Sequence, residues 1–444
     1  MSPTDAPPEE PLTLEEIREG WSLFDAEERV EAFKQLIRSD AEDFFLDLTA
    51  SEQAVLVQGL APTERRSWLR LLAPDDAADL LQEIPSEQRP GLIALLDDVT
   101  QKDVTGLLVF AEDDAGGLMN PRYARLRPDI GVDEAISYLR KLARERLGTI
   151  YYAYVLDPEM HLLGAVSLRE LFAATPEKLV RDVMQTEVIK ADEQMDQEQL
   201  ARMFAQSDLV AIPIIDAENR MKGIVTIDDI VDVVREEATE DIQHIGGTEA
   251  LDEPYMTGRF WGMVRKRAGW LAALFIGELF TATAMQSYED ELKHATVLML
   301  FLPLIISSGG NSGSQATTLV IRAMALGEVK LRDWWRVIRR EVASGLALGA
   351  MLAPIGVIRI LIWQALGWAD YTKYYGRVGL SVGLSVIGIV TWGTIAGSML
   401  PFILRRLGFD PARASAPFVA TLVDVSGLVI YFTISSIVLA GTLL

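Results

Sequence analysis

Three polar residues share one face of an otherwise apolar segment near the end of the sequence. Pro417, Thr421 and Asp424 lie four and three residues apart, which places them on one side of a helix. Counted from Arg413, Asp424 lies about 17 Å along that helix, near mid-membrane. A carboxylate is costly in lipid unless it faces a partner or a pathway, and no basic residue lies at matching depth. We therefore interpret Asp424 as part of a cation site.

A second polar group, Ser307–Gln315, lies inside another apolar segment and reads Ser-Ser-Gly-Gly-Asn-Ser-Gly-Ser-Gln. Backbone freed by such residues is tolerated at membrane depth only where it is buried in protein or lines water. We expect an interrupted helix that adds Asn311 and Gln315 to the pathway. The alternative is a packing face of small residues. Glu278, another acid in an apolar segment, either lines the route or pairs with polar groups of another chain.

Oxygen ligands of these types suit hard cations, and Mg²⁺ in particular keeps several of its waters. Rings of acidic side chains are a common filter for cations. Since one Asp per chain makes a weak ring, we expect the site to lie on the symmetry axis of an oligomer.

Five apolar segments supply the elements that must position these residues. Each exceeds the roughly 20 residues that a membrane-spanning helix needs; they lie at about 267–287, 294–325, 342–366, 378–404 and 412–443. Basic residues cluster before the first segment, between the second and third, and between the fourth and fifth. The positive-inside rule therefore predicts a multi-pass plasma (inner) membrane protein with a cytoplasmic N-terminus and its C-terminus outside.

The charge of the chain is strongly divided. The chain has 41 basic residues (Lys and Arg) and 64 acidic residues (Asp and Glu). From residue 259 onward it has 17 basic and 10 acidic residues, so residues 1–258 hold 24 basic and 54 acidic residues. An acidic surface of this size attracts cations and argues against a nucleic-acid partner. With no Cys, three scattered His and no nucleophile–base pattern or phosphate-binding loop, we do not expect an enzyme.

The acidic half contains two kinds of repeat. Residues 12–110 predict short helices separated by Pro-containing turns such as Pro62-Thr63 and Pro74-Asp75, which favours a helical superhelix. Residues 119–240 contain a duplication, in which Asp157 to Leu171 matches Asp216 to Ile230 at constant offset. Each copy predicts strand, turn, strand and helix.

The duplication resembles a tandem CBS pair, and the whole chain resembles the MgtE magnesium transporters. The resemblance rests on the order of the parts, on Glu112–Met119, on Gly309–Gln315 and on Pro417, Thr421 and Asp424. It implies a multidomain fold with an α-helical superhelical N-terminal domain, an α/β tandem CBS domain and a five-helix transmembrane domain. The implied boundaries are 1–118, 119–240, a connecting plug helix at 241–264, and 265–444.

The same resemblance implies a homodimeric Mg²⁺ channel that intracellular Mg²⁺ closes. The implied pore residues are Asn311, Gln315, Ala420, Thr421 and Asp424, the last holding hydrated Mg²⁺. The implied regulatory metal ligands are Asp75, Asp79, Asp196, Glu198, Asp229, Asp232, Glu237, Glu240, Asp241 and Asp410. ATP binding to the CBS pair is implied for Tyr152, Arg169 and Glu170. Ala416 departs from an Asn that some members carry, which leaves the choice among Mg²⁺, Mn²⁺ and Co²⁺ open.

Two other functions fit parts of the sequence. An ion-coupled secondary transporter for divalent cations would need broken helices in symmetry-related halves, and five segments do not divide into such halves. A non-conducting, membrane-anchored CBS sensor would not need Asp424 or the polar segment Ser307–Gln315.

Overall fold

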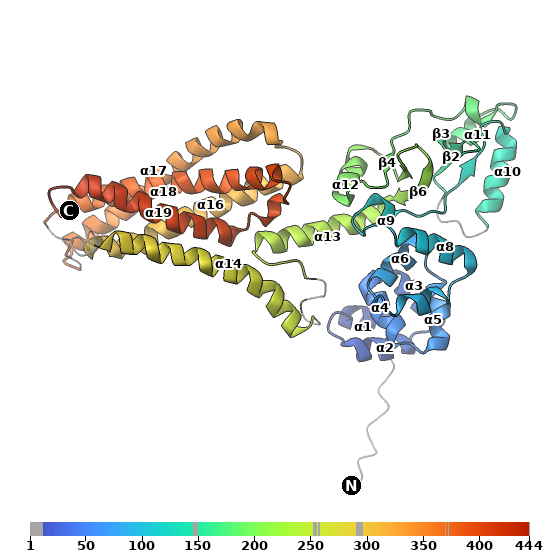
Figure 1. The fold of residues 1–444 in the computed structure, drawn as a ribbon, viewed down its shortest axis with the longest axis horizontal. Helices are drawn as coiled ribbons and strands as arrows, with labels where there is room; N and C mark the ends of the chain where they lie inside the picture. The colour runs from blue at the N-terminus through green and yellow to red at the C-terminus, as the bar shows by residue number, and fades with distance from the viewer. Residues whose placement is uncertain are drawn as a thin grey trace, which may run out of the picture. The chain divides into compact units, whose positions relative to one another are not determined.

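The computed structural model describes residues 12–144, 150–251, 255, 258–289, 296–368, 370–371 and 373–443. The chain forms two compact units, one of Met1–Glu237 with Glu253–Thr257 and the other of Ala238–Asp252 with Gly258–Leu444. The boundary falls within helix α13 (Ile227–Ile245) (Figure 1). Parts of two predicted elements lie outside the described residues, namely 294–295 of the second span and 252–254 and 256–257 of the connecting helix.

The first unit begins with the predicted helical repeat. Its helices are α1 (Leu14–Gly20), α2 (Ala26–Gln35), α3 (Arg38–Leu46), α4 (Ala50–Gly59), α5 (Pro62–Leu69), α6 (Pro74–Gln82), α7 (Arg89–Ile93), α8 (Asp98–Leu107) and α9 (Ala115–Leu118). Helices two apart in the sequence pack together: α2 on α4, α4 on α6, and α6 on α8. Pro62 and Pro74 begin their helices as predicted, because a missing N–H costs nothing in the first turn. The superhelical N-terminal part is confirmed.

The duplicated segment folds into two similar α/β halves. The first holds β1 (Arg125–Leu126), α10 (Val132–Leu142), β2 (Tyr152–Leu156), β3 (Leu162–Ser167), α11 (Leu168–Ala173) and η1 (Val180–Asp182). The second holds β4 (Ala191–Asp192), α12 (Gln197–Gln206), β5 (Ala211–Ile215), β6 (Met221–Thr226) and α13. In each half a short strand runs parallel to the first strand of an antiparallel hairpin. Both hairpin turns place a residue at positive φ, Met160 and Asn219. The duplication is confirmed.

One apolar core joins the helical repeat to the second α/β half. Buried residues of α4, α6 and α8 belong to the same cluster as Leu200, Ile212 and Val225 of the second half. The first half has a separate core that includes Leu139, Val155 and Leu171. The shared core fixes α6 against the beginning of α13, within the first unit.

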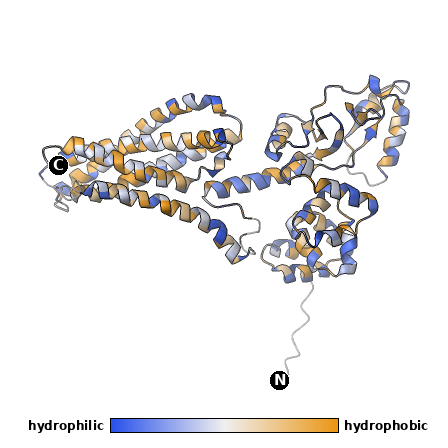
Figure 2. Ribbon diagram, in the orientation of Figure 1, coloured by the Kyte–Doolittle hydropathy of each residue, from blue (hydrophilic) through white to orange (hydrophobic). Residues whose placement is uncertain are grey.

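Within the described residues, five helices are long and apolar enough to cross a membrane, as predicted. Their apolar residues stand out in Figure 2. The elements are α14 (Phe260–Ser287), η2 (Thr296–Phe301) leading into α16 (Leu302–Ala325), η3 (Leu331–Asp333) leading into α17 (Trp334–Ala365), α18 (Tyr375–Arg406), η4 (Pro411–Arg413) and α19 (Ala416–Leu439). Helix α18 lies at the centre and packs on α16, α17 and α19, while α14 packs on α19.

The expected interruption at Ser307–Gln315 is wrong, because α16 continues through it as one helix. Its glycines serve close packing instead. A Cβ on Gly393 would lie 2.3 Å from the Gly309 carbonyl oxygen, and one on Gly397 would lie 2.1 Å from that of Gly313. Two Gly-x-x-x-Gly faces therefore meet with their backbones in contact, the arrangement that small residues permit between membrane helices. Thr317 adds a hydroxyl hydrogen bond to the Gly397 carbonyl (2.8 Å).

Two helix ends near the predicted sites are also defined by the structure. Pro417 lies in the first turn of α19, where it breaks no helical bond and frees no carbonyl. The predicted continuous helix over 241–264 is not formed, because α13 ends at Ile245 and α14 begins at Phe260. Gly247 has φ +76° just after α13, the left-handed conformation that commonly ends a helix.

The contact between the glycines predicts that the effect of a Gly→Ala substitution on stability depends strongly on its position in α18. Gly397→Ala puts a methyl group against backbone that cannot move aside, so we expect destabilisation by roughly 2 kcal/mol or more. Gly376→Ala is the matched control in the same helix, because its Cβ meets nothing within 4 Å. Thermal unfolding of the purified protein in detergent measures both. Equal melting temperatures for the two variants would contradict the packing argument.

Candidate ion pathway and cytoplasmic acid cluster

Asp424 lies on α19 where this helix packs against Gly310 of α16. Because α19 begins at Ala416 rather than Arg413, Asp424 is about 12 Å along the helix, nearer its start than the sequence predicted. A Cβ on Gly310 of α16 would lie 3.4 Å from that of Ala420 and 3.8 Å from a carboxylate oxygen of Asp424. The Asp424 side chain is half-buried and has no hydrogen-bond or ion-pair partner in the described part of the chain. An ionised group in this position needs a cation from outside the chain.

The other predicted pore residues lie on the same two helices. Ala420 and Thr421 precede Asp424 on α19, and the Thr421 hydroxyl donates to the Pro417 carbonyl (3.1 Å). Asn311 and Gln315 are exposed one turn apart on α16, so they share a helical face. The structure thus brings the α19 residues together, and it presents the two α16 amides on a surface of the single chain.

Glu278 of α14 lies near this group. Gly277 meets Thr421 closely, since a Cβ there would lie 2.8 Å from Cγ2 of the threonine. The carboxylates of Glu278 and Asp424 are close enough to repel each other, although Glu278 itself is exposed. A second negative charge beside Asp424 strengthens the attraction of this region for cations.

In the first unit, acids of α6 face acids at the beginning of α13. Asp75 is buried, with 7% of its surface exposed, and its carboxylate accepts a hydrogen bond from Asn120 (3.0 Å). Asp229 accepts bonds from the Thr226 hydroxyl and backbone N–H at 2.7 and 3.1 Å. The structure thus brings together Asp75, Asp79 and Asp229 from the predicted set.

Burial and mutual repulsion raise the pKa values of these acids. Desolvation, and then the charges of Asp76 and Asp229, raise the pKa of Asp79 to about 8. Desolvation also raises the pKa of Asp229 to about 6, against the hydrogen bonds from Thr226. Burial raises the pKa of Asp75 well above its usual range. Such a cluster favours either protons or a bridging divalent cation.

Several members of this cluster were missed from the sequence. The charges of Asp76, Glu112, Asp228 and Glu236 also act on it. The adjacent acids Asp75-Asp76 and Asp228-Asp229 are visible in the sequence as two acidic pairs. That the two pairs lie close together follows only from the shared core. No three acidic or His side chains in the described ranges form a ready-made metal coordination group, so a bridging ion would bind partly through water or after side chains rearrange.

The remaining predicted acids of the first unit are held by local contacts. Asp196 caps α12 through the N–H groups of Glu198 and Gln199, and Glu198 pairs with Arg202. Asp232 pairs with Arg235 at 3.4 Å on the surface. Glu237 accepts a hydrogen bond from Gln197 (2.7 Å), which brings the end of this unit's α13 segment beside α12.

His244, which was not selected in the sequence analysis, joins two predicted ligands of the second unit. Its Nδ1 lies 3.2 Å from an Asp410 oxygen, and its Nε2 lies 3.6 Å from Glu240. The Asp410 carboxylate also caps η4 through the Ala412 N–H (2.8 Å). Asp241 lies on the same turn of α13 as Glu240. The imidazole thus ties the end of α13 to the loop that leads into α19.

The three nucleotide candidates meet at one end of the first α/β half. Tyr152 begins β2 and pairs with Ser167 of β3, and Arg169 and Glu170 follow in the first turn of α11. The Glu170 carboxylate already accepts bonds from the N–H and hydroxyl of Ser167 (both 2.8 Å) and from Gln185 (2.6 Å). Few lone pairs of this carboxylate are therefore left to accept a hydrogen bond from a nucleotide.

Comparison with known proteins identifies the family. A sequence model of the MgtE family, described as divalent cation transporter, matches residues 302–434. The MgtE intracellular N domain matches residues 12–113, and a CBS domain matches residues 180–236. The magnesium transporter MgtE of Thermus thermophilus is 37% identical over 424 residues, covering 94% of this chain and 91% of that protein. The chain belongs to the MgtE family.

A second magnesium transporter supports this assignment. The magnesium transporter MgtE of Bacillus subtilis is 32% identical over 408 residues, covering 92% of this chain and 88% of that one. A solved cytosolic domain of the Mg²⁺ channel MgtE, in complex with ATP, is 36% identical and covers 50% of this chain and 90% of its own, with a TM-score of 0.46. The predicted family and the predicted class of divalent-cation transporter are confirmed.

The raised pKa of Asp79 predicts how stability depends on pH. An unfolded Asp has a pKa near 3.9, so between about pH 4 and 8 the folded protein binds more protons than the unfolded chain. Without divalent cations, the free energy of unfolding should therefore fall as pH rises through this window, by up to about 1.4 kcal/mol per pH unit. Asp79→Asn should flatten the dependence and stabilise the protein at pH 8.

Thermal proteolysis of the acidic half in the full-length protein, without Mg²⁺ at pH 5–8, measures this effect. Glu31→Gln removes an exposed charge from α2 and serves as the control. If Asp79→Asn leaves the dependence of stability on pH unchanged, the raised pKa does not belong to Asp79.

Proposed function

We propose that this protein is a homodimeric Mg²⁺ channel for magnesium uptake, with α16 and α19 of both copies lining a pore on the two-fold axis. The observation that carries the proposal is Asp424, a half-buried carboxylate without a partner in the described residues, at the crossing of these helices. The relatives named magnesium transporters support Mg²⁺ as the ion.

Symmetry completes the site. Two facing copies supply two Asp424 carboxylates, whose combined charge matches one Mg²⁺. Mg²⁺ gives up its waters reluctantly, so Asp424 holds the hydrated ion through water. Asn311 and Gln315, exposed in one chain, extend the polar lining, with Ala420 and Thr421 beside the carboxylate.

Intracellular Mg²⁺ closes this channel in our proposal. When no cation bridges them, the acids of α6 and α13 repel one another and weaken the contact between their helices. Bound Mg²⁺ removes this repulsion and so shifts the population toward the compact, closed arrangement. The proposed ligands are Asp75, Asp79, Asp196, Glu198, Asp229, Asp232, Glu237, Glu240, Asp241 and Asp410. The tie from His244 to Asp410 supports a route from α13 to α19.

The orientation and a nucleotide site complete the proposal. The acidic half lies in the cytoplasm and the C-terminus outside the inner membrane, as the basic loops indicate. Residues 1–118 and 119–240 act as the sensing domains, 241–264 connect them to the pore, and 265–444 form the pore domain. ATP binds beside Tyr152, Arg169 and Glu170, with Glu170 giving up one of its present hydrogen bonds.

Flux measurements test the pore. Asp424→Asn keeps the shape of the side chain but removes its charge, so Mg²⁺ flux into liposomes should fall by at least roughly tenfold, equivalent to about 1.4 kcal/mol. Glu328→Gln, at an exposed position between α16 and α17, should conduct like wild type. A wild-type protein that never moves Mg²⁺ would favour a membrane-anchored sensor, and flux that requires a second ion gradient would favour a coupled transporter.

Closure is tested by raising Mg²⁺ on the side that carries the acidic half. Wild-type flux should fall, while Asp79→Asn should need a several-fold higher Mg²⁺ concentration to close, because the amide cannot release a proton to become an anionic ligand for Mg²⁺. Its flux at low Mg²⁺ should be unchanged, and Glu31→Gln should behave like wild type throughout. Identical closure in both variants would remove the α6 cluster from the regulatory mechanism.

A further inference from the structure

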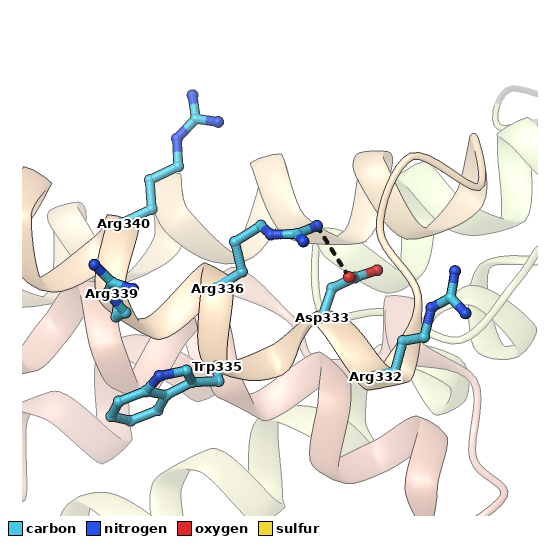
Figure 3. Close-up of a pocket in the computed structure, with 6 residues that line it drawn as sticks. All are labelled: Arg332, Asp333, Trp335, Arg336, Arg339 and Arg340. Carbon is cyan, nitrogen blue, oxygen red and sulfur yellow. Dashed lines mark hydrogen bonds and ion pairs between the residues drawn. The ribbon is translucent and has the colours of Figure 1, made fainter.

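An open pocket at the beginning of α17 is lined mainly by arginines. It encloses about 530 Å³ and is lined by Arg332, Asp333, Trp335, Arg336, Arg339 and Arg340. These residues, hereafter the arginine pocket, come from η3 and the first two turns of α17 (Figure 3). None of them belongs to the proposed ion pathway or to the acid cluster.

Helical spacing explains why these side chains gather. Arg332, Arg336 and Arg340 follow one another at intervals of four, and Arg339 is three residues after Arg336, so neighbouring turns present them together. Asp333 fixes the turn, because its carboxylate accepts a hydrogen bond from the Lys330 backbone N–H (3.1 Å). Figure 3 shows the Arg336 guanidinium directed at the same carboxylate, with Arg332 on its other side.

Positive charge in the arginine pocket is not balanced by the chain. Arg336 pairs with Asp333 at 3.2 Å. Arg332, Arg339 and Arg340 are exposed, and no carboxylate among the described residues forms an ion pair with them, although the charge of Glu341 acts on Arg340. Four guanidinium groups around one carboxylate leave a strong attraction for an anion. Planar guanidinium groups match the oxygens of a phosphate group in particular.

Two tryptophans indicate where this anion comes from. Trp334 and Trp335, 49% and 57% exposed, lie about two turns before the apolar segment that begins at about residue 342. Exposed tryptophans at the end of a membrane span are typical of the headgroup level of a bilayer, and basic pockets at that level bind anionic headgroups. We propose that the arginine pocket binds the phosphate of an anionic phospholipid headgroup.

Lipid binding to the full-length protein tests this proposal. Native mass spectrometry of the detergent-purified protein, titrated with phosphatidylglycerol or with phosphatidylcholine of the same acyl chains, should show preferential retention of phosphatidylglycerol. Arg336→Gln with Arg340→Gln should weaken that retention roughly 30-fold, since each arginine near a charged headgroup contributes about a fivefold change. Exchange of both residues for Lys keeps the charge but removes the planar guanidinium groups, so it should weaken retention less than the Gln pair does.

The matched control is Arg405→Gln with Arg406→Gln, which removes equal charge at the end of α18, outside the arginine pocket, and should weaken lipid retention much less than the pocket pair. Gel filtration and thermal unfolding verify that each variant folds, and the Lys pair carries the test if the Gln pair does not. Equal retention of both lipids, or an equal loss in the control, would overturn the proposal. Binding of inorganic phosphate that displaces phosphatidylglycerol, with the same arginine dependence, would assign the pocket to a soluble phosphate instead.

Discussion

Backbone contact between α16 and α18 is the constraint on which the membrane half depends. Gly309 and Gly313 face Gly393 and Gly397 with no room for a Cβ, so the helices approach as closely as two backbones can. Van der Waals contact, rather than the hydrophobic effect, holds helices together in lipid, and it increases steeply as the helices come closer. Between those two glycines, Gly310 faces α19. The same run of residues therefore packs α16 on α18 and brings it against Asp424.

The acidic half is governed by an opposing pair of forces. Its shared apolar core holds α6 against the beginning of α13, while the carboxylates on these helices repel one another. Raised pKa values are the signature of this conflict. A cation relieves the repulsion without disturbing the core, so the ionic conditions can change the balance while the fold is kept.

The sequence predicted features that depend on local pattern. The five spans, the helical repeat and the duplicated strand–turn–strand–helix units follow from hydropathy and spacing, and all of them are present. It failed where one residue type has two uses. Glycines in Ser307–Gln315 predict a broken helix and a packing face equally well, and only the opposite face on α18 decides between them. Pro417 resembles a helix breaker until the first residue of α19 is known.

The candidate site was predicted to a similar extent. Asp424 was selected for its charge in an apolar segment, and Asp79 through the resemblance to the MgtE family. His244 was not selected, because its role depends on Asp410, which lies 166 residues away. Asp76 and Asp228 likewise gain significance only from the core that joins their helices. Contacts between distant segments leave no periodicity in the sequence, so pattern analysis cannot find them.

The shared core also determines which parts of the chain fold together. The helical repeat and the second α/β half are one cluster of buried side chains, whereas the first half has its own. Cooperative units follow buried contacts rather than sequence repeats. The second copy therefore shares its main core with α1–α9, whereas the first copy has its own core and is joined to the second by a smaller buried cluster of Tyr154, Leu156, Leu162 and Met221.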